Sequence, residues 1–474
     1  MCRLLLVSFV RMAVMNTRRK THRLLFLIVV VGLAVCEVSR AQDVRTLTPD
    51  ACVEIALDNR FAVLASQYQE EIRFARYAEA RTARWPDLST SATYHRLSPN
   101  VPEFAIDLPD GFDTITPDVT IFPAILDRYA LEARVEHVLF SAGERTHTVR
   151  AERLRVSASR HARRDVEAEV AFEVQMAYWD LVESDARVDV LQIAQQHVDE
   201  QVRVVRARHA RGAALASDIL ALEARRAEIE VEKRNAEAQA QVARWKLSDR
   251  MGLPGDTVIR PAVRSIPHRP VRMTTDELAA EALSQRKDLQ ALASEADAWR
   301  QQARATSRSR WPKLSVMGSY LYARPNPSIV PLQEEFEGTW EVGVRMSVDV
   351  WDWNQNAFRE DQARREAALA RERHAMRRQR LWVEVAEARV DVQRAHDVWT
   401  ASRTRENATA EVYRVMRRRQ QEGAALTTEV LAAELAYREA SVAVVEAEAR
   451  YAVANAWLDR VTGSPATDAW TPRR

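Results

Sequence analysis

The stretch that decides the fold is Arg211-Gly-Ala-Ala-Leu-Ala-Ser-Asp-Ile-Leu220, which lies between two long helical patterns. It recurs with little change as Glu422-Gly-Ala-Ala-Leu-Thr-Thr-Glu-Val-Leu431. Glycine readily adopts the left-handed conformation that ends a helix, so each stretch predicts a turn between two helices. One copy alone is no more than an ordinary helix end. Two copies, with Gly212 and Gly423 separated by 211 residues, indicate a duplicated architecture.

Each turn also carries signals for the start of the next helix. Ser217 and Thr428 are expected to cap that helix, and the acids Asp218 and Glu429 suit its positive N-terminal end. The residues expected to form the two turns are Gly212, Ala213, Leu215, Ser217 and Asp218 in the first copy and Gly423, Ala424, Leu426 and Thr428 in the second.

The duplication extends over most of the chain. Residues 48–89 match residues 274–315 at an offset of 226, including Trp-Pro-x-Leu-Ser at both 85–89 and 311–315. From Phe140 onward the offset is 211, so the first half holds 15 extra residues before Phe140. The Pro- and Asp-rich segment 98–127 lies there, where a loop tolerates an insertion.

The expected domain boundaries follow from the two ends of the chain and from the linker between its halves. Residues 1–41 resemble a signal peptide, with basic residues, an apolar run and a small-x-small site ending at Ala41. Its start is expected at Met1 or at Met15, and the alternatives are an uncleaved anchor or lipidation at Cys36. The remaining expected domains are a first repeat at 42–252, a linker at 253–273, a second repeat at 274–463 and a tail at 464–474.

The composition favours long helices and argues against several function classes. Lys and Arg number 69 against 67 Asp and Glu, so the net charge of +2 gives no footprint for nucleic acid. Only 11 of the 474 residues are glycine. The His are scattered, and we find no metal-ligand spacing, phosphate-binding loop or nucleophile elbow. We therefore expect no catalytic residues, no metal, no cofactor and no enzymatic activity.

Four short segments predict strands: the first can be extended after a proline, and the other three alternate apolar and polar residues. They are 88–97, 129–140, 314–322 and 340–350, and in the last of them Val342, Val344, Met346, Val348 and Val350 alternate with polar positions such as Arg345. About ten alternating residues are typical of a transmembrane β-strand. A soluble hairpin packed on a core is the alternative. Four strands cannot close a barrel, so three copies of the chain would be needed to supply twelve.

The strands are fused to long helices expected at 48–84, 144–207, 216–250, 274–309, 355–421 and 427–461. A heptad seam from Val170 to Val205 predicts coiled-coil packing, with a partner helix returned by the turn at Gly212. Aromatic residues lie where strand meets helix, namely Phe140, Trp351 and Trp353. They fit an interfacial girdle, and core filling is the alternative.

Together these motifs resemble the TolC-like outer-membrane efflux proteins. They are Leu-Thr-x-x-Ala at 47–51, Trp-Pro-x-Leu-Ser at 85–89, Phe-Ser-Ala-Gly-Glu-Arg at 140–145 and the two glycine turns. The resemblance implies a mainly α fold with transmembrane β-strands: duplicated α-hairpins form a periplasmic helical barrel, and a homotrimer forms a twelve-stranded barrel in the outer membrane of a Gram-negative-type bacterium. It also implies a channel whose partners are a periplasmic adaptor and an inner-membrane transporter.

The resemblance further implies that the turns contact the adaptor and that Glu429 narrows the closed aperture. Two departures stand out: Ala432 replaces a second acid, and Asp-Trp-Asn-Gln at 352–355 replaces a glycine-bearing junction. The alternatives are an exported coiled-coil adaptor or a structural protein. An adaptor needs one hairpin and separate β domains, and a structural coiled coil has no use for four alternating strands.

Overall fold

The computed structural model describes residues 44–100, 104–106, 119–122, 124–255, 257–265, 270–330 and 332–464. The expected signal segment, with Met15 and Cys36, lies outside these residues. So do parts of segment 98–127 and of the linker, and all but the first residue of the tail.

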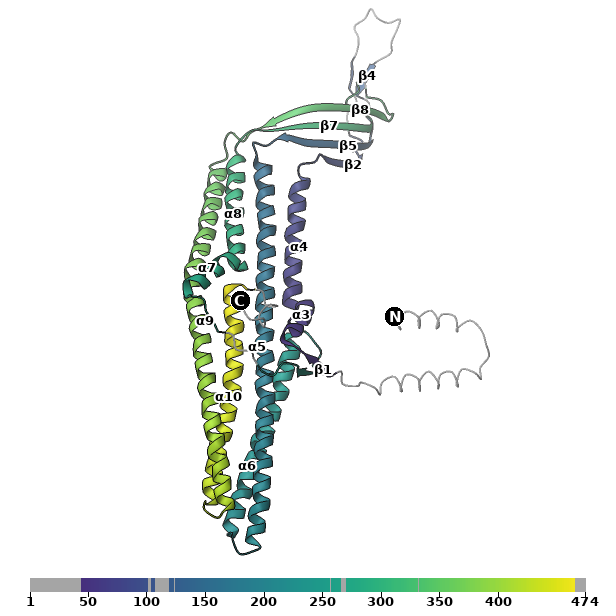
Figure 1. Ribbon diagram of the computed structural model, residues 1–474. Helices are drawn as coiled ribbons and strands as arrows, with labels where there is room; N and C mark the ends of the chain where they lie inside the picture. Colours follow the sequence, from purple (N-terminus) through teal and green to yellow (C-terminus); the bar gives the residue numbers. More distant parts are fainter. Residues whose placement is uncertain are drawn as a thin grey trace, which may run out of the picture.

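The chain forms a long bundle of helices with a sheet across one end (Figure 1). The helices are α3 (Pro49–Asn59), α4 (Phe61–Thr82), α5 (Glu144–His209), α6 (Ala216–Arg250), α7 (Thr275–Gln285), α8 (Lys287–Arg308), α9 (Gln355–Gln421) and α10 (Thr427–Thr462). The two glycine turns lie at the end of the bundle far from the sheet. Among the described residues, no helix is both long and apolar enough to cross a membrane.

The sheet contains strands from both halves of the chain. Its strands are β2 (Asp87–Arg96), β5 (Asp127–Phe140), β7 (Lys313–Arg324) and β8 (Glu337–Ser347), hydrogen-bonded in the order β2-β5-β7-β8 and antiparallel throughout. The β5–β7 pairing joins the first half to the second. The expected strand at 340–350 extends too far, because β8 ends at Ser347 and leaves Val348 and Val350 outside it.

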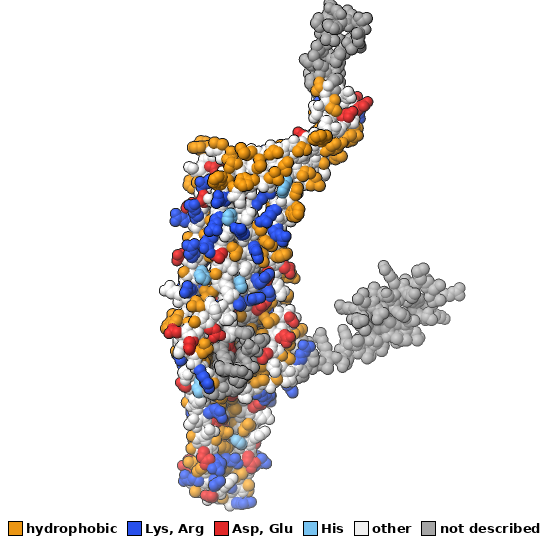
Figure 2. All heavy atoms as spheres, turned by 45° about the horizontal axis from the view of Figure 1, so that its top comes forward, with side chains coloured by type: hydrophobic (Ala, Val, Ile, Leu, Met, Phe, Trp, Pro, Cys, Tyr) orange, Lys and Arg blue, Asp and Glu red, His pale blue; other side chains and the backbone are white. Residues whose placement is uncertain are grey.

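The register separates an apolar face from a polar one. Val344 lies opposite Val316, and Val342 lies opposite Gly318, whereas Arg345 on the other face lies opposite Ser315. The apolar side chains are not packed against a core of this protomer: Trp340, Val342 and Val344 are 77, 70 and 66% exposed. Figure 2 shows hydrophobic side chains gathered over the strands. The alternative of a soluble hairpin on a core does not fit this exposure.

Four short strands fall outside the expected pattern. Within the inserted segment, β3 (Phe104–Ile106) pairs with β4 (Val119–Phe122), so a hairpin stands where the sequence predicted a loop. Near the middle of the bundle, β1 (Val44–Leu47) pairs in parallel with β6 (Val258–Pro261) from the linker. The hydroxyl of the buried Tyr178 donates to Val263 O at 3.1 Å and accepts from Val263 N at 3.0 Å, which ties this small sheet to α5.

The helices expected at 48–84 and 274–309 are each broken, and in this respect the prediction was wrong. Arg60 and Arg286 have extended backbones, with ψ of 125° and 124°, and separate α3 from α4 and α7 from α8. Each arginine places its side chain against a carboxylate of a long helix: Arg60 on Glu173 of α5 and Arg286 on Glu384 of α9. These tertiary contacts accompany a break that helix propensity alone does not predict.

The largest apolar core surrounds the small β1–β6 sheet, with Trp179, Leu181, Leu247 and Tyr451 among its buried side chains. The predicted heptad seam is confirmed over its length: Val174, Leu181, Leu191, Val198 and Val205 are buried. In the stretch that leads to the turn, Val198 and Val205 pack with Leu222 and Ile229 of α6. The partner helix therefore lies in the same chain.

Candidate functional site

The two glycine turns have the same backbone geometry. Gly212 and Gly423 have φ of +73° and +80°, the left-handed region that favours glycine. The amide of Ala213 donates to Arg208 O at 2.9 Å, and that of Ala424 donates to Arg419 O at 2.8 Å. A Cβ on Gly212 would meet no atom within 4 Å. The glycines are therefore required by the backbone angle and not by lack of space.

The expected caps Ser217 and Thr428 are wrong. The residues before the first helical turns are Leu215 and Leu426, and Ser217 and Thr428 lie inside the helices. The acids serve the helix ends instead: Leu215 N donates to Asp218 Oδ2 at 3.1 Å, and Leu426 N donates to Glu429 Oε2 at 2.9 Å. A carboxylate satisfies an otherwise unpaired backbone amide more strongly than a neutral hydroxyl, because the hydrogen bond is charge-assisted.

Both turns present apolar side chains to solvent. Leu215 and Leu426 are 69 and 68% exposed, and Gly212, Ala213, Ser217, Gly423, Ala424 and Thr428 are exposed too. Glu429 is exposed whereas its counterpart Asp218 is half-buried. The structure thus brings the predicted turn residues together at one end of the bundle, and in each turn an exposed leucine is the last residue before the next helix.

Charged and polar side chains join the two hairpins near these turns. We call Arg225, Glu232, Glu434 and Arg438 the hairpin bridge. Arg225 of α6 donates to Glu434 of α10, with Nη2 and Oε2 separated by 3.3 Å, and Arg438 of α10 pairs with Glu232 of α6. Closer to the tip, Arg208 Nη1 donates to Gln420 O at 2.7 Å.

The hairpin bridge is partly shielded from water. The side chains of Glu434 and Arg438 are 3 and 9% exposed. Burial raises the pKa of Glu434, and the charges of Arg225 and Arg438 oppose that shift. Sequence reasoning missed this cluster. The available signal was the pair of charged residues four and eight positions after the buried Val430, on the same face of α10.

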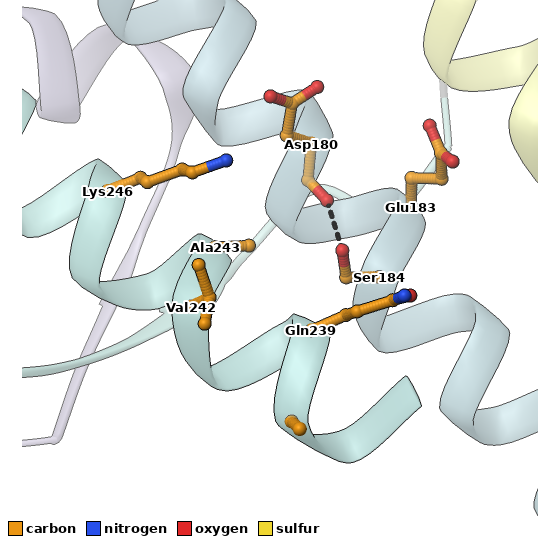
Figure 3. A pocket seen from close by; sticks show the side chains of 8 residues that line it. Asp180, Glu183, Ser184, Gln239, Val242, Ala243 and Lys246 are labelled. Atoms are coloured by element: carbon orange, nitrogen blue, oxygen red, sulfur yellow. Dashed lines mark hydrogen bonds between the residues drawn. The ribbon is translucent and has the colours of Figure 1, made fainter. Parts of the chain in front are cut away.

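The groove between α5 and α6 shown in Figure 3 offers no catalytic arrangement. It has a volume of about 400 Å³ and is lined by Asp180, Glu183, Ser184, Ala238, Gln239, Val242, Ala243 and Lys246. The hydroxyl of Ser184 donates to the backbone oxygen of Asp180 at 2.8 Å, so no base in the groove activates it. Burial raises the pKa of both Asp180 and Glu183.

The strand-to-helix junctions repeat an unusual backbone. Ala142 and Gly143 have φ of 48° and 90°, and the matching Trp353 and Asn354 have φ of 52° and 63°. Asn354 replaces the glycine of the first junction at little cost, because asparagine tolerates the left-handed region better than most residues. The departure in sequence at 352–355 therefore preserves the conformation.

Exposed aromatic residues mark all four places where the sheet meets the helices. Phe140, Trp351 and Trp353 are 54, 75 and 81% exposed, which excludes core filling within this protomer. Trp85 and Trp311, at the other two junctions, are 74 and 55% exposed. Sequence reasoning did not include these two tryptophans in the expected girdle, although they occupy the repeated Trp-Pro motif.

Comparison with known proteins agrees with this architecture. The profile of a family described as Outer membrane efflux protein matches residues 52–248 and 278–464. The profile therefore covers most of both halves. No functionally curated protein matches the chain.

Several solved structures share the fold. A membrane protein from Pseudomonas aeruginosa is 20% identical, with 88% of this chain and 90% of that one covered and a TM-score of 0.70. The outer membrane protein VceC from Vibrio cholerae is 16% identical, with 88 and 96% covered and a TM-score of 0.68. The Campylobacter jejuni CmeC outer membrane channel is 15% identical, with 88 and 85% covered and a TM-score of 0.71.

The family match, the exposed apolar sheet and the long duplicated hairpins agree with one another. They confirm the predicted mainly α, TolC-like fold with its added β-strands, and they place the chain in the outer membrane with its helices extending into the periplasm. The chain belongs to the outer membrane efflux protein family.

Proposed function

We propose that three copies of this chain form a continuous exit duct that receives substrates from a periplasmic adaptor and an inner-membrane transporter. The observation that carries the proposal is the four-stranded sheet, in which β2 and β8 pair with no further strand among the described residues and one face is apolar. Open sheet edges are not tolerated in lipid. Three sheets joined edge to edge would close a barrel of twelve strands.

The helices support the same assembly. Below the sheet they follow the strand order, since α4 packs on α5, α5 on α8 and α8 on α9. The outer helices of this row carry exposed apolar side chains, such as Phe61 and Phe74 on α4 and Phe358 and Leu369 on α9. A neighbouring copy would cover both edges. The helical row would then close into a barrel that continues the strand barrel.

The two turns form the end of this duct farthest from the sheet, and we assign adaptor contact to their exposed residues. Glu429 is assigned to the aperture, where three copies would bring three carboxylates together. The duct works as a channel without catalysis. A wide aqueous duct makes few specific contacts with the substrates that pass through it.

The test is the mass and conductance of the purified full chain. In detergent, light scattering should give a protein mass three times that of the chain, and the protein should form ion-conducting channels in planar bilayers. A monomer without conductance would favour the exported adaptor or structural protein instead. Copurification of an adaptor and a transporter from the native host tests the partners separately.

A further inference from the structure

We propose that four arginines just below the sheet, Arg150, Arg153, Arg304 and Arg308, bind the phosphate groups of anionic phospholipids in the periplasmic leaflet of the outer membrane. We call these residues the arginine belt. The inference rests on the proposed trimer, since the sheet must span the membrane for the belt to reach a headgroup.

The arginine belt lies at one side of two neighbouring helices. On α5, His147 and Arg155 contact α8, and Arg160 and Arg163 contact α4. Successive residues of a helix are about 100° apart around its axis. Seen from the axis of α5, the directions toward α8 and α4 therefore enclose an angle of about 150° on the side that carries Glu152. Arg150 and Arg153 lie on the opposite side of α5, where the angle between the two neighbouring helices is larger. The larger angle marks the convex side of the curved row of helices, and this side becomes the outer surface when the row closes.

The arginines of α8 lie on the same convex side of the row of helices. Arg155 of α5 stacks over Trp299 of α8, with 5.3 Å between the guanidinium carbon and the ring centre. This contact lies on the concave side of the row, the side that carries Glu152. Arg304 and Arg308 lie about 140° and 180° around the helix from Trp299. They therefore share the convex surface with Arg150 and Arg153. Figure 2 shows Lys and Arg side chains gathered on the helices directly below the hydrophobic strands.

The depth of the belt matches a headgroup layer. The aromatic girdle marks the lower edge of the apolar sheet. Arg308 ends α8, and Arg304 lies about 6 Å below it at 1.5 Å per residue. Arg150 and Arg153 lie about 9 and 14 Å below the start of α5. Side chains of α5 lean toward its N-terminus, which is the sheet end, so both can extend upward.

The belt is free to bind a ligand. All four side chains are exposed, and none forms an ion pair with another described residue. Nearby acids are already engaged, since Glu144 pairs with Lys313, Glu152 with Arg155 and Asp297 with Arg300. A guanidinium binds phosphate oxygens through two parallel hydrogen bonds. Twelve such groups in a trimer suit the anionic phosphodiester of phosphatidylglycerol and disfavour a net-neutral headgroup.

The test measures lipid retained by the purified trimer. The trimer is incubated with an equimolar mixture of phosphatidylglycerol and phosphatidylcholine, and the bound lipids are counted by native mass spectrometry. We expect phosphatidylglycerol to be enriched at least threefold, since one arginine near an anionic surface favours it on the order of fivefold. Replacing all four arginines by glutamine should reduce the ratio to about one, and salt should weaken the wild-type enrichment.

Arg164 provides a matched control on α5. It is exposed, unpaired among the described residues and on the same side as Arg153, but about 16 Å farther from the sheet. Arg153→Gln should lower the enrichment while Arg164→Gln leaves it unchanged, and this pair carries the test should the fourfold variant fail to assemble. Equal loss in both variants, or full enrichment in the fourfold variant, overturns the arginine belt. Absence of a trimer in the wild type counts against the proposed duct instead.

Discussion

The guanidinium of Arg286 lies 2.9 Å from the carboxylate of Glu384 and thereby fastens the break between α7 and α8 to α9. The first half repeats the pair as Arg60 and Glu173, 3.0 Å apart, at the break between α3 and α4. The copies differ in their surroundings. Arg286 is 4% exposed and also contacts Asp288, whereas Arg60 is 20% exposed and Glu173 is shared with Arg250.

This difference predicts unequal costs. Arg286→Ala should reduce the stability by about 3 kcal/mol, because it removes one partner of a buried pair and leaves Glu384 and Asp288 with Arg377 alone. Arg60→Ala should cost about 1 kcal/mol, since its partner keeps Arg250 and water. Chemical denaturation of the detergent-solubilised protein measures both. Equal losses of stability in the two variants would contradict the prediction that the arginine pair of the second half contributes more than that of the first.

Asp288 predicts a pH dependence. Burial raises its pKa, but the hydrogen bond and charge of Arg286 and those of Arg377 outweigh burial and bring the pKa to about 2, below the ordinary 3.8. Because the folded pKa is depressed, this stabilisation is present above pH 4 and is lost as the pH falls from about 4 to 2. It amounts to about 2 kcal/mol. Asp288→Asn should flatten the acid side of the stability profile between these values; an unchanged acid side would contradict the prediction.

The two faces of the sheet predict opposite tolerance. Val344→Arg places a charge on the apolar face at about 2–4 kcal/mol per copy near the middle of the bilayer, so fewer trimers should reach the membrane. Arg345→Ala, one residue away on the polar face, should assemble normally. The measurement is the yield of trimer in outer-membrane fractions. Equal yields would mean that the faces are assigned the wrong way round.

Glu429 can be separated from its role as a helix cap. It accepts a hydrogen bond from Leu426 N just as Asp218 accepts one from Leu215 N, so Glu429→Ala and Asp218→Ala remove equivalent caps at about 1 kcal/mol each. If Glu429 lines the aperture, only Glu429→Ala should change single-channel conductance or cation selectivity in a planar bilayer. An identical response in both variants would leave Glu429 as a cap alone.

The exposed turns predict loss of efflux without loss of assembly. Gly212 and Gly423 have positive φ, which costs a side chain about 1–2 kcal/mol, but a Cβ meets nothing within 4 Å at Gly212 and only Arg208 Nη2, at 3.9 Å, at Gly423. Gly212→Trp or Gly423→Trp should therefore assemble as trimers yet fail in efflux, because the bulky ring blocks adaptor docking. Gly255→Trp, in the linker with no atom within 4 Å of its Cβ, is the control. Normal efflux in all three variants would remove the turns from the adaptor contact.

Most of the architecture could be predicted from the sequence because its signals are local and repeated. A glycine at positive φ ends a helix wherever it occurs, so Gly212 and Gly423 located both hairpins. Alternation over about ten residues identified three of the four long strands, and the fourth followed from the helix stop at Pro86 and from its match in the second half of the chain. The turn residues followed from the same signals, since Leu215 and Leu426 lie within a few residues of their glycines.

Contacts between distant parts of the chain required the tertiary structure. Arg225 and Glu434 are 209 residues apart, and the pairing of β1 with β6 joins the N-terminal strand to the linker. The breaks at Arg60 and Arg286 coincide with ion pairs to other helices, and local helix propensity carries no signal of such contacts. The sequence alone determined the repeated hairpins and strands, because backbone angle and periodicity act within a few residues. Only the tertiary structure decided which charges meet between hairpins, because burial and distance depend on how the helices pack.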